Sequence, residues 1–211
     1  MEKQINQHAL PTKTMATLAI IISIVVFMSF GFKNQSTVSN LKNENNGKDS
    51  IESVKAFMEV YKVLMSPRCM NCHPSGDVPL QGDDSHLHTM LPRRGMDGKG
   101  AYAMKCSNCH QPENVAGLHM PPGNPNWHLP PANMKMVFQG RTPRQLAMQL
   151  INPKTNGNKN LQQLIEHADD GLVKAGWNPG EGLTLPPLSH GAFKNVWLKW
   201  LNTGAYAPPA K

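Results

Sequence analysis

Two short segments of this chain repeat one pattern, in which two cysteines separated by two residues are followed directly by a histidine. Each thiol of such a segment can bond to one vinyl group of a haem while the histidine ligates the iron, so the spacing is typical of c-type haem attachment. The sequence therefore predicts two covalently attached haem c groups. The attaching cysteines and proximal histidines are Cys69, Cys72, His73, Cys106, Cys109 and His110.

Paired cysteines also bind structural zinc, which takes four thiolates in a tetrahedron. Zinc would not require a histidine after both pairs. The chain has four cysteines in all, and each belongs to one of the two segments, which argues against a disulfide framework. Haem is the favoured interpretation, with zinc or a redox dithiol as the alternative.

An uncharged segment near the N-terminus predicts export. Thr14 to Phe32 is rich in isoleucine and valine and contains no charged residue. At about 1.5 Å per residue it could span a bilayer, and it also suits a signal peptide. We expect 1–32 to be a signal peptide or signal anchor, with the rest of the chain on the periplasmic side of the cytoplasmic membrane.

The polar composition of 33–50 predicts a flexible linker, since it offers few apolar residues for a core. We expect a single dihaem cytochrome c unit over 51–204, followed by a tail over 205–211. Only about 30 residues separate the two motifs, too few for a core of their own. The first haem segment, 51–97, is therefore expected to share its packing with the second, 98–204.

Helical spacing and capping residues predict an all-α fold with long loops rich in proline and glycine. The formal charge of +7 is not concentrated in a basic run, so no nucleic-acid binding is expected. A mildly positive surface suits an acidic redox partner protein or anionic headgroups. The first predicted helix begins after Asp49, and its apolar face consists of Ile51, Val54, Met58, Tyr61 and Met65. A short second helix is predicted to run through Tyr102 and Met104 into Cys106. Three more are predicted to begin after the capping residues Thr142, Asn160 and Ser189.

The second motif and its surroundings resemble class I cytochromes c. Gly98 to His110 looks like the entry helix and attachment motif, and Pro125 to Trp127 looks like the Gly-Pro-Asn-Leu loop of that family. The resemblance implies that the Pro125 carbonyl orients His110.

Two later segments extend this likeness. Leu146 to Lys154 is similar to the family's helix ending in Asn-Pro-Lys, and Phe193 to Leu201 is similar to its aromatic C-terminal helix. The resemblance implies a class I cytochrome c-like fold over Gly98 to Thr203, and it does not account for 51–97.

The whole globular region also resembles small dihaem cytochrome subunits labelled as isoquinoline 1-oxidoreductase type. This likeness implies a molybdenum hydroxylase as a redox partner. The residues that carry it are His88, Arg94, Gly95, Pro121 to Trp127, His167, Trp177, Pro179 and Gly180.

Low-spin haems in electron transfer need a sixth ligand, histidine or methionine. No methionine follows Met148, so His167 is the expected distal ligand of the second haem, with His190 in reserve. For the first haem we expect His88, with Met96 in reserve.

These patterns predict an exported dihaem cytochrome that relays single electrons, possessing no substrate chemistry of its own. A periplasmic or membrane-bound oxidoreductase could include it as a subunit. The alternative is a small dihaem peroxidase or oxidoreductase, in which one iron keeps an open position.

Overall fold

The structure is a computed structural model that describes residues 35–210, with side chains described from Gly47 on. The predicted signal peptide or anchor, 1–32, lies outside these residues. A compact unit begins at Asp49. Within the part that is described, no helix is both long and apolar enough to span a bilayer.

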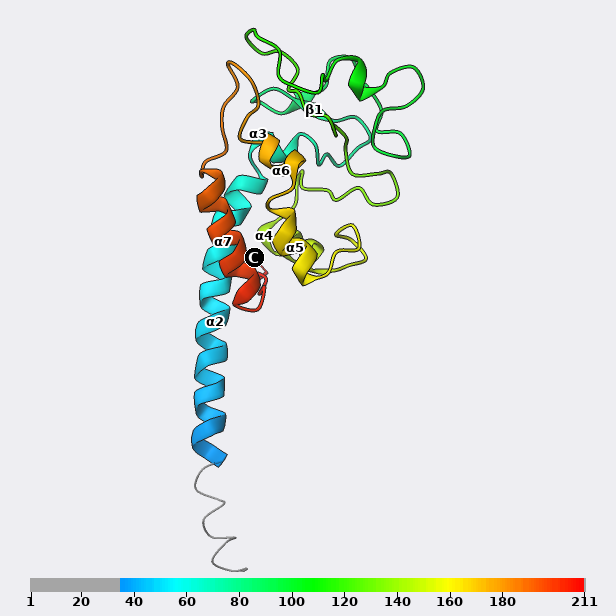
Figure 1. Cartoon of the computed structure of the whole chain (residues 1–211). Helices are drawn as coiled ribbons and strands as arrows, with labels where there is room; N and C mark the ends of the chain where they lie inside the picture. Colours follow the sequence, from blue (N-terminus) through cyan, green and yellow to red (C-terminus); the bar gives the residue numbers. More distant parts are fainter. Residues whose placement is uncertain (1–34, 211) are drawn as a thin grey trace, which may run out of the picture. The chain divides into compact units, whose positions relative to one another are not determined.

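Helices dominate the described chain, and a two-stranded antiparallel sheet pairs Leu80 with Leu87. This confirms the mainly helical prediction (Figure 1). Long irregular segments connect the elements, above all between β2 and α4. The elements are α2 (Gln35–Leu64), α3 (Pro67–Met70), β1 (Leu80–Gln81), β2 (His86–Leu87), the 3-10 turn η1 (Cys106–Asn108), α4 (Pro143–Ile151), α5 (Leu161–His167), α6 (Gly171–Ala175) and α7 (His190–Asn202).

Helix α2 starts earlier than predicted, and its buried residues differ from the predicted ones, although Tyr61 and Met65 pack against the core as predicted. It is already helical from Gln35, where the sequence predicts a linker, because extending an existing helix costs less than nucleating one. The predicted apolar position Ile51 is 58% exposed. The buried positions recur at three- and four-residue spacing instead, and they are Ser53, Ala56, Phe57, Val60, Val63 and Leu64.

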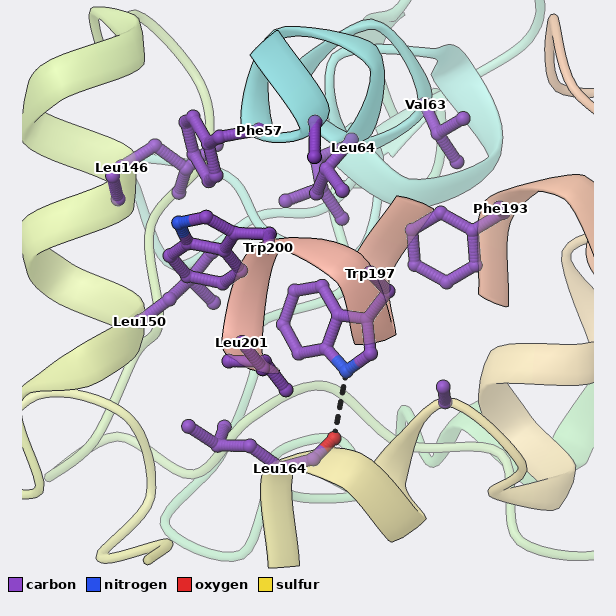
Figure 2. Packing of buried hydrophobic residues seen from close by; sticks show 14 of the residues in the cluster. Phe57, Val63, Leu64, Leu146, Leu150, Leu164, Phe193, Trp197, Trp200 and Leu201 are labelled. Atoms are coloured by element: carbon purple, nitrogen blue, oxygen red, sulfur yellow. Dashed lines mark hydrogen bonds between the residues drawn. The ribbon is translucent and has the colours of Figure 1, made fainter. Parts of the chain in front are cut away.

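The core lies between α2, α7 and the two helices α4 and α5. The rings of Phe57 and Trp200 lie 4.7 Å apart, and the Ser53 hydroxyl donates a hydrogen bond to the Trp200 carbonyl at 3.1 Å. Figure 2 shows Trp197 donating from its indole nitrogen to the Leu164 carbonyl, at 2.8 Å, which ties α5 to α7. Helices far apart in the sequence are therefore joined by buried aromatic side chains.

Capping chemistry places the later helices as predicted. Thr142 and Gln145 form a capping box at the start of α4, and Asn160 and Gln163 form another at α5. Ser189 caps α7. The single helix predicted after Asn160 is two helices in the structure, because the chain turns after His167 and α6 starts with its own cap at Asp170.

The prediction of a helix before Cys106 is wrong. Tyr102 has a φ of +54° and is 92% exposed, and only η1 forms at the motif. At Gly98 the φ is +78°, and an added Cβ would lie 1.9 Å from the Leu129 carbonyl oxygen. Glycine is required there because the backbone at Leu129 passes so close.

Candidate functional site

Both motifs line one cavity of about 1720 Å³. This volume exceeds the roughly 300–1,000 Å³ typical of a site for one small ligand. Helices α2 and α3 deliver the first motif to the cavity, and the loop around η1 delivers the second. All six predicted attachment residues contribute to the lining, namely Cys69, Cys72, His73, Cys106, Cys109 and His110.

His73 is held by the segment that precedes α4. Its Nδ1 donates to the carbonyl of Met136 at 2.7 Å, since a carbonyl can only accept. Its ring stacks on Phe138 with centroids 3.9 Å apart and planes within 9°. The Phe138 backbone N–H also donates to the His73 carbonyl at 2.9 Å. These contacts fix the tautomer that leaves the Nε2 lone pair free for a metal.

His110 is held in the same way by a different loop. Its Nδ1 donates to a carbonyl at 2.7 Å, and its ring stacks on Trp127 with centroids 4.0 Å apart and planes within 11°. The accepting carbonyl belongs to Pro122, so the expected role of Pro125 is wrong. The accepting carbonyl therefore lies earlier in the loop than the resemblance implies. The adjacent Gly123 anchors this part of the loop, because its N–H donates to the Asn114 side chain at 2.6 Å.

Burial keeps both histidines neutral. It lowers the pKa of His73 to about 4, although the hydrogen bond to Met136 acts in the opposite direction. Burial also lowers the pKa of His110, against the effect of the Pro122 carbonyl. Near neutral pH each ring therefore presents an unprotonated Nε2, the form that binds iron.

The four cysteines are free thiols. Burial raises the pKa of Cys69 to about 12 and that of Cys72 to about 11, and it also raises the pKa of Cys106. The thiols of Cys69, Cys72 and Cys106 are therefore protonated at neutral pH. Across residues 35–210, no three or more histidine, cysteine, aspartate or glutamate side chains form a group that could hold a metal ion.

The distal candidates separate into two classes. His88 and His167 both line the cavity and are partly buried. The two reserves are not brought to the cavity. Met96 is 80% exposed, and the Nε2 of His190 is bonded to the Ala168 carbonyl at 2.8 Å. Further histidines on the lining are His86, His119 and His128.

Arg94 joins the two motif-bearing segments, a role that the sequence does not predict. Its side chain is only 1% exposed. It donates to the Gly76 carbonyl at 3.1 Å and to the Pro130 carbonyl at 2.5 Å, and its backbone N–H donates to the Asp77 carbonyl at 2.8 Å. The loop after the first motif is thereby tied to the loop that follows the second.

Sequence reasoning also missed the groups that hold the histidines, which are Met136, Phe138, Pro122 and Trp127. In the sequence of each loop, an aromatic residue follows closely after a proline or a methionine. The sequence near these residues does not show which loop supports the histidine of which motif.

The chain matches no family model, no curated protein and no solved structure. The case for a function therefore rests on the geometry of the cavity.

Proposed function

We propose that this protein is an exported dihaem c-type cytochrome that relays single electrons. The observation that carries the proposal is a repeated geometry. In each motif the histidine donates Nδ1–H to a backbone carbonyl, stacks on an aromatic ring and borders the shared cavity with its two cysteines. Two unrelated loops provide the same support to His73 and His110, which indicates a shared task.

The donor set fits haem c. Cys69 and Cys72 would hold one haem and Cys106 and Cys109 the other, with one neutral histidine for each iron. The bound haem supplies one-electron chemistry at iron. The chain holds each proximal ring in one orientation and surrounds the first motif with buried apolar side chains, including Phe138, Leu164 and Trp197.

The two attachment sites share one cavity. A thiolate at Cys106 would raise the pKa of Cys72, which agrees with this shared location. Haems attached at these positions would lie near one another in the cavity. This favours electron transfer between them and supports a relay.

A class I cytochrome c-like arrangement is part of the proposal, centred on the first motif. Helix α2 enters that motif directly, and the aromatic C-terminal helix α7 packs on α2 through Phe57 and Trp200. The resemblance seen around Gly98 to His110 suggested the second motif for this position. The helical core instead lies beside the first motif, where Cys69 and Met70 pack against it.

Two further histidines on the cavity lining favour a relay over a peroxidase with an open iron. His88 and His167 line the same cavity as the motifs and could complete both coordination spheres. We further propose a protein redox partner, for which the resemblance suggests a molybdenum hydroxylase. A periplasmic location, with or without a membrane anchor, follows from 1–32.

The test is absorption spectroscopy of the protein produced with periplasmic haem attachment. The proposal predicts two low-spin haems that bind no carbon monoxide when reduced. A reduced haem that binds carbon monoxide readily, together with peroxide turnover, would instead support the peroxidase. Incubation of the protein with zinc provides the control for a thiolate metal site.

A further inference from the structure

We propose that an acidic face beside the cavity docks a redox partner protein whose own surface is positively charged. The acidic face consists of the β1–β2 hairpin (80–88), the loop 111–120 and the strap 178–188 between α6 and α7. This inference rests on the proposed dihaem relay and adds the place and the charge of the partner. It reverses the partner charge that the net charge of +7 suggests.

The charge of the acidic face is opposite to that of the chain. Over the whole sequence, lysine and arginine outnumber aspartate and glutamate by 21 to 14. The three segments of the face contain neither lysine nor arginine, and they contain the exposed residues Asp83, Asp84, Glu113 and Glu181. Arg68 lies 2.6 Å from Asp83 and compensates its charge, which leaves the other three carboxylates to set the sign of the face.

Hydrogen bonds hold the three segments of the acidic face together. The strap is joined to the hairpin and to the loop. The bonds run from the Thr184 N–H to the Asp83 side chain at 3.1 Å, from the His119 N–H to the Glu181 carbonyl at 2.9 Å, and from the Asn114 side chain to the Asn178 carbonyl at 2.9 Å. Figure 1 shows the strap, drawn in orange, reaching the end of the unit where β1 lies. The carboxylates of all three segments therefore belong to one surface.

Exposed apolar side chains lie on the same three segments. Leu87 of the hairpin, Leu118 of the loop and Leu185 of the strap are each more than half exposed. A Cβ added at Gly182 would lie 3.2 Å from Leu118 Cδ2, so the loop packs directly on the strap. None of the three leucines lines the cavity, so a haem bound there would not cover them. Exposed apolar side chains bordered by charge are typical of protein interaction sites.

The acidic face borders the cavity that receives both motifs. Each of its segments contributes to the lining, among others through Gly82, His119 and Leu183. A partner bound to this face would therefore stand beside the proposed haems, where electrons can pass between the two proteins.

The charge of the face selects a basic protein as its occupant. Carboxylates repel anionic headgroups and nucleic acid, and they attract a surface rich in lysine and arginine. Complementary charges of this kind accelerate association, and the apolar side chains provide contact area once the two surfaces meet.

Electron exchange with a basic probe tests the acidic face. The reduced dihaem protein is mixed with a ferric class I cytochrome c of high positive charge, so that one electron leaves a ferrous iron of this chain and reduces the iron of the probe. Combining Glu113→Lys with Glu181→Lys should lower the second-order rate constant by about tenfold in about 0.1 M salt, because attraction becomes repulsion. Raising the salt should reduce this difference.

The matched control reverses two carboxylates outside the acidic face. Glu59→Lys on α2 combined with Glu166→Lys on α5 changes the net charge of the chain by the same amount. We expect this variant to lose no more than about threefold in rate, since salt confines the effect of a charge to its surroundings. Equal losses in the two variants would overturn the proposal, because net charge alone would then explain them.

A second measurement locates the bound probe without electron transfer. Addition of the zinc-substituted form of the same cytochrome should shift the amide magnetic resonance signals of His119 and Thr184. Shifts confined to Arg93 to Lys105, a segment with exposed cations, would overturn the proposal.

Two further readouts separate the ways in which the proposal can fail. By mass spectrometry, a chain without covalent haem refutes the proposed function, whereas a dihaem chain whose exchange is unaffected by Glu113→Lys with Glu181→Lys refutes only the acidic face. By analytical ultracentrifugation, a dimer that dissociates in this variant would overturn the basic partner in favour of a second copy of the chain.

Discussion

His73 and His110 are each held by one carbonyl and one aromatic ring, supplied from loops distant in sequence. The hydrogen bond sets the tautomer, and the stacked ring restricts rotation about the side chain. A histidine held in this way would lose little entropy on binding iron and would keep its orientation if the charge on the iron changed.

The stacked rings should act separately on the two haems. Phe138→Leu removes the ring under His73, and Trp127→Leu removes the ring under His110. We expect each substitution to shift the resonance signal of one haem and to leave the other unchanged. Because Phe138 is buried, its replacement should also lower the free energy of unfolding by about 1–3 kcal/mol. One substitution that shifts both signals equally would refute separate support.

Arg94 should be a large contributor to stability. Arg94→Ala removes the donor of two part-buried hydrogen bonds, to the Gly76 and Pro130 carbonyls, together with the packing of a side chain that is only 1% exposed, and we expect it to cost about 1–3 kcal/mol in all. Its exposed neighbour provides the control, since Arg93→Ala should change stability by no more than about 0.5 kcal/mol. Denaturant unfolding measures both values, and equal losses would show that the Arg94 contacts are unimportant.

At the scale of the helices, the buried face of α2 decides how the chain enters the first motif. Phe57 is fully buried against Trp200, whereas Ile51 is exposed. We expect Phe57→Ala to lower the free energy of unfolding by about 3–5 kcal/mol. Ile51→Ala, measured in the same way, should have a small effect. A larger loss of unfolding free energy in Ile51→Ala than in Phe57→Ala would instead support the helix face predicted from the sequence.

Helix caps are the part of the fold that sequence predicts best. The capping box of Thr142 with Gln145 and the cap at Asn160 are local signals, and both are confirmed; Gln163, which completes a second capping box at Asn160, is added by the structure. Thr142→Ala should cost about 1 kcal/mol in thermal or denaturant unfolding. Thr184→Ala on an exposed loop is the control, and a comparable cost there would show that the cap contributes nothing specific.

Long-range packing is the part that the sequence could not supply. The face of α2 was misread because a buried Ser53 stands among its apolar residues and bonds to α7, which no helical pattern reveals. The contact between His73 and Met136 spans 63 positions. The cysteines and histidines of the two motifs could be singled out from the sequence because the chemistry of haem attachment would fix their spacing, whereas the loops that support the histidines are fixed only by tertiary contacts.

At the scale of the whole unit, the two motifs are parts of one site. Arg94 joins their segments, one cavity receives all six attachment residues, and the helical core packs beside the first motif. The proposed relay follows from this arrangement, because two haems held in one cavity can exchange electrons within the protein.

The central claim is that both motifs carry covalent haem, and the mass of the intact, denatured protein tests it most directly. The account predicts the mass of the chain plus two haems. It predicts one haem for the variant with Cys69→Ser and Cys72→Ser, and one for the variant with Cys106→Ser and Cys109→Ser. A denatured chain of unmodified mass, produced alongside a known c-type cytochrome that matures normally, would contradict it.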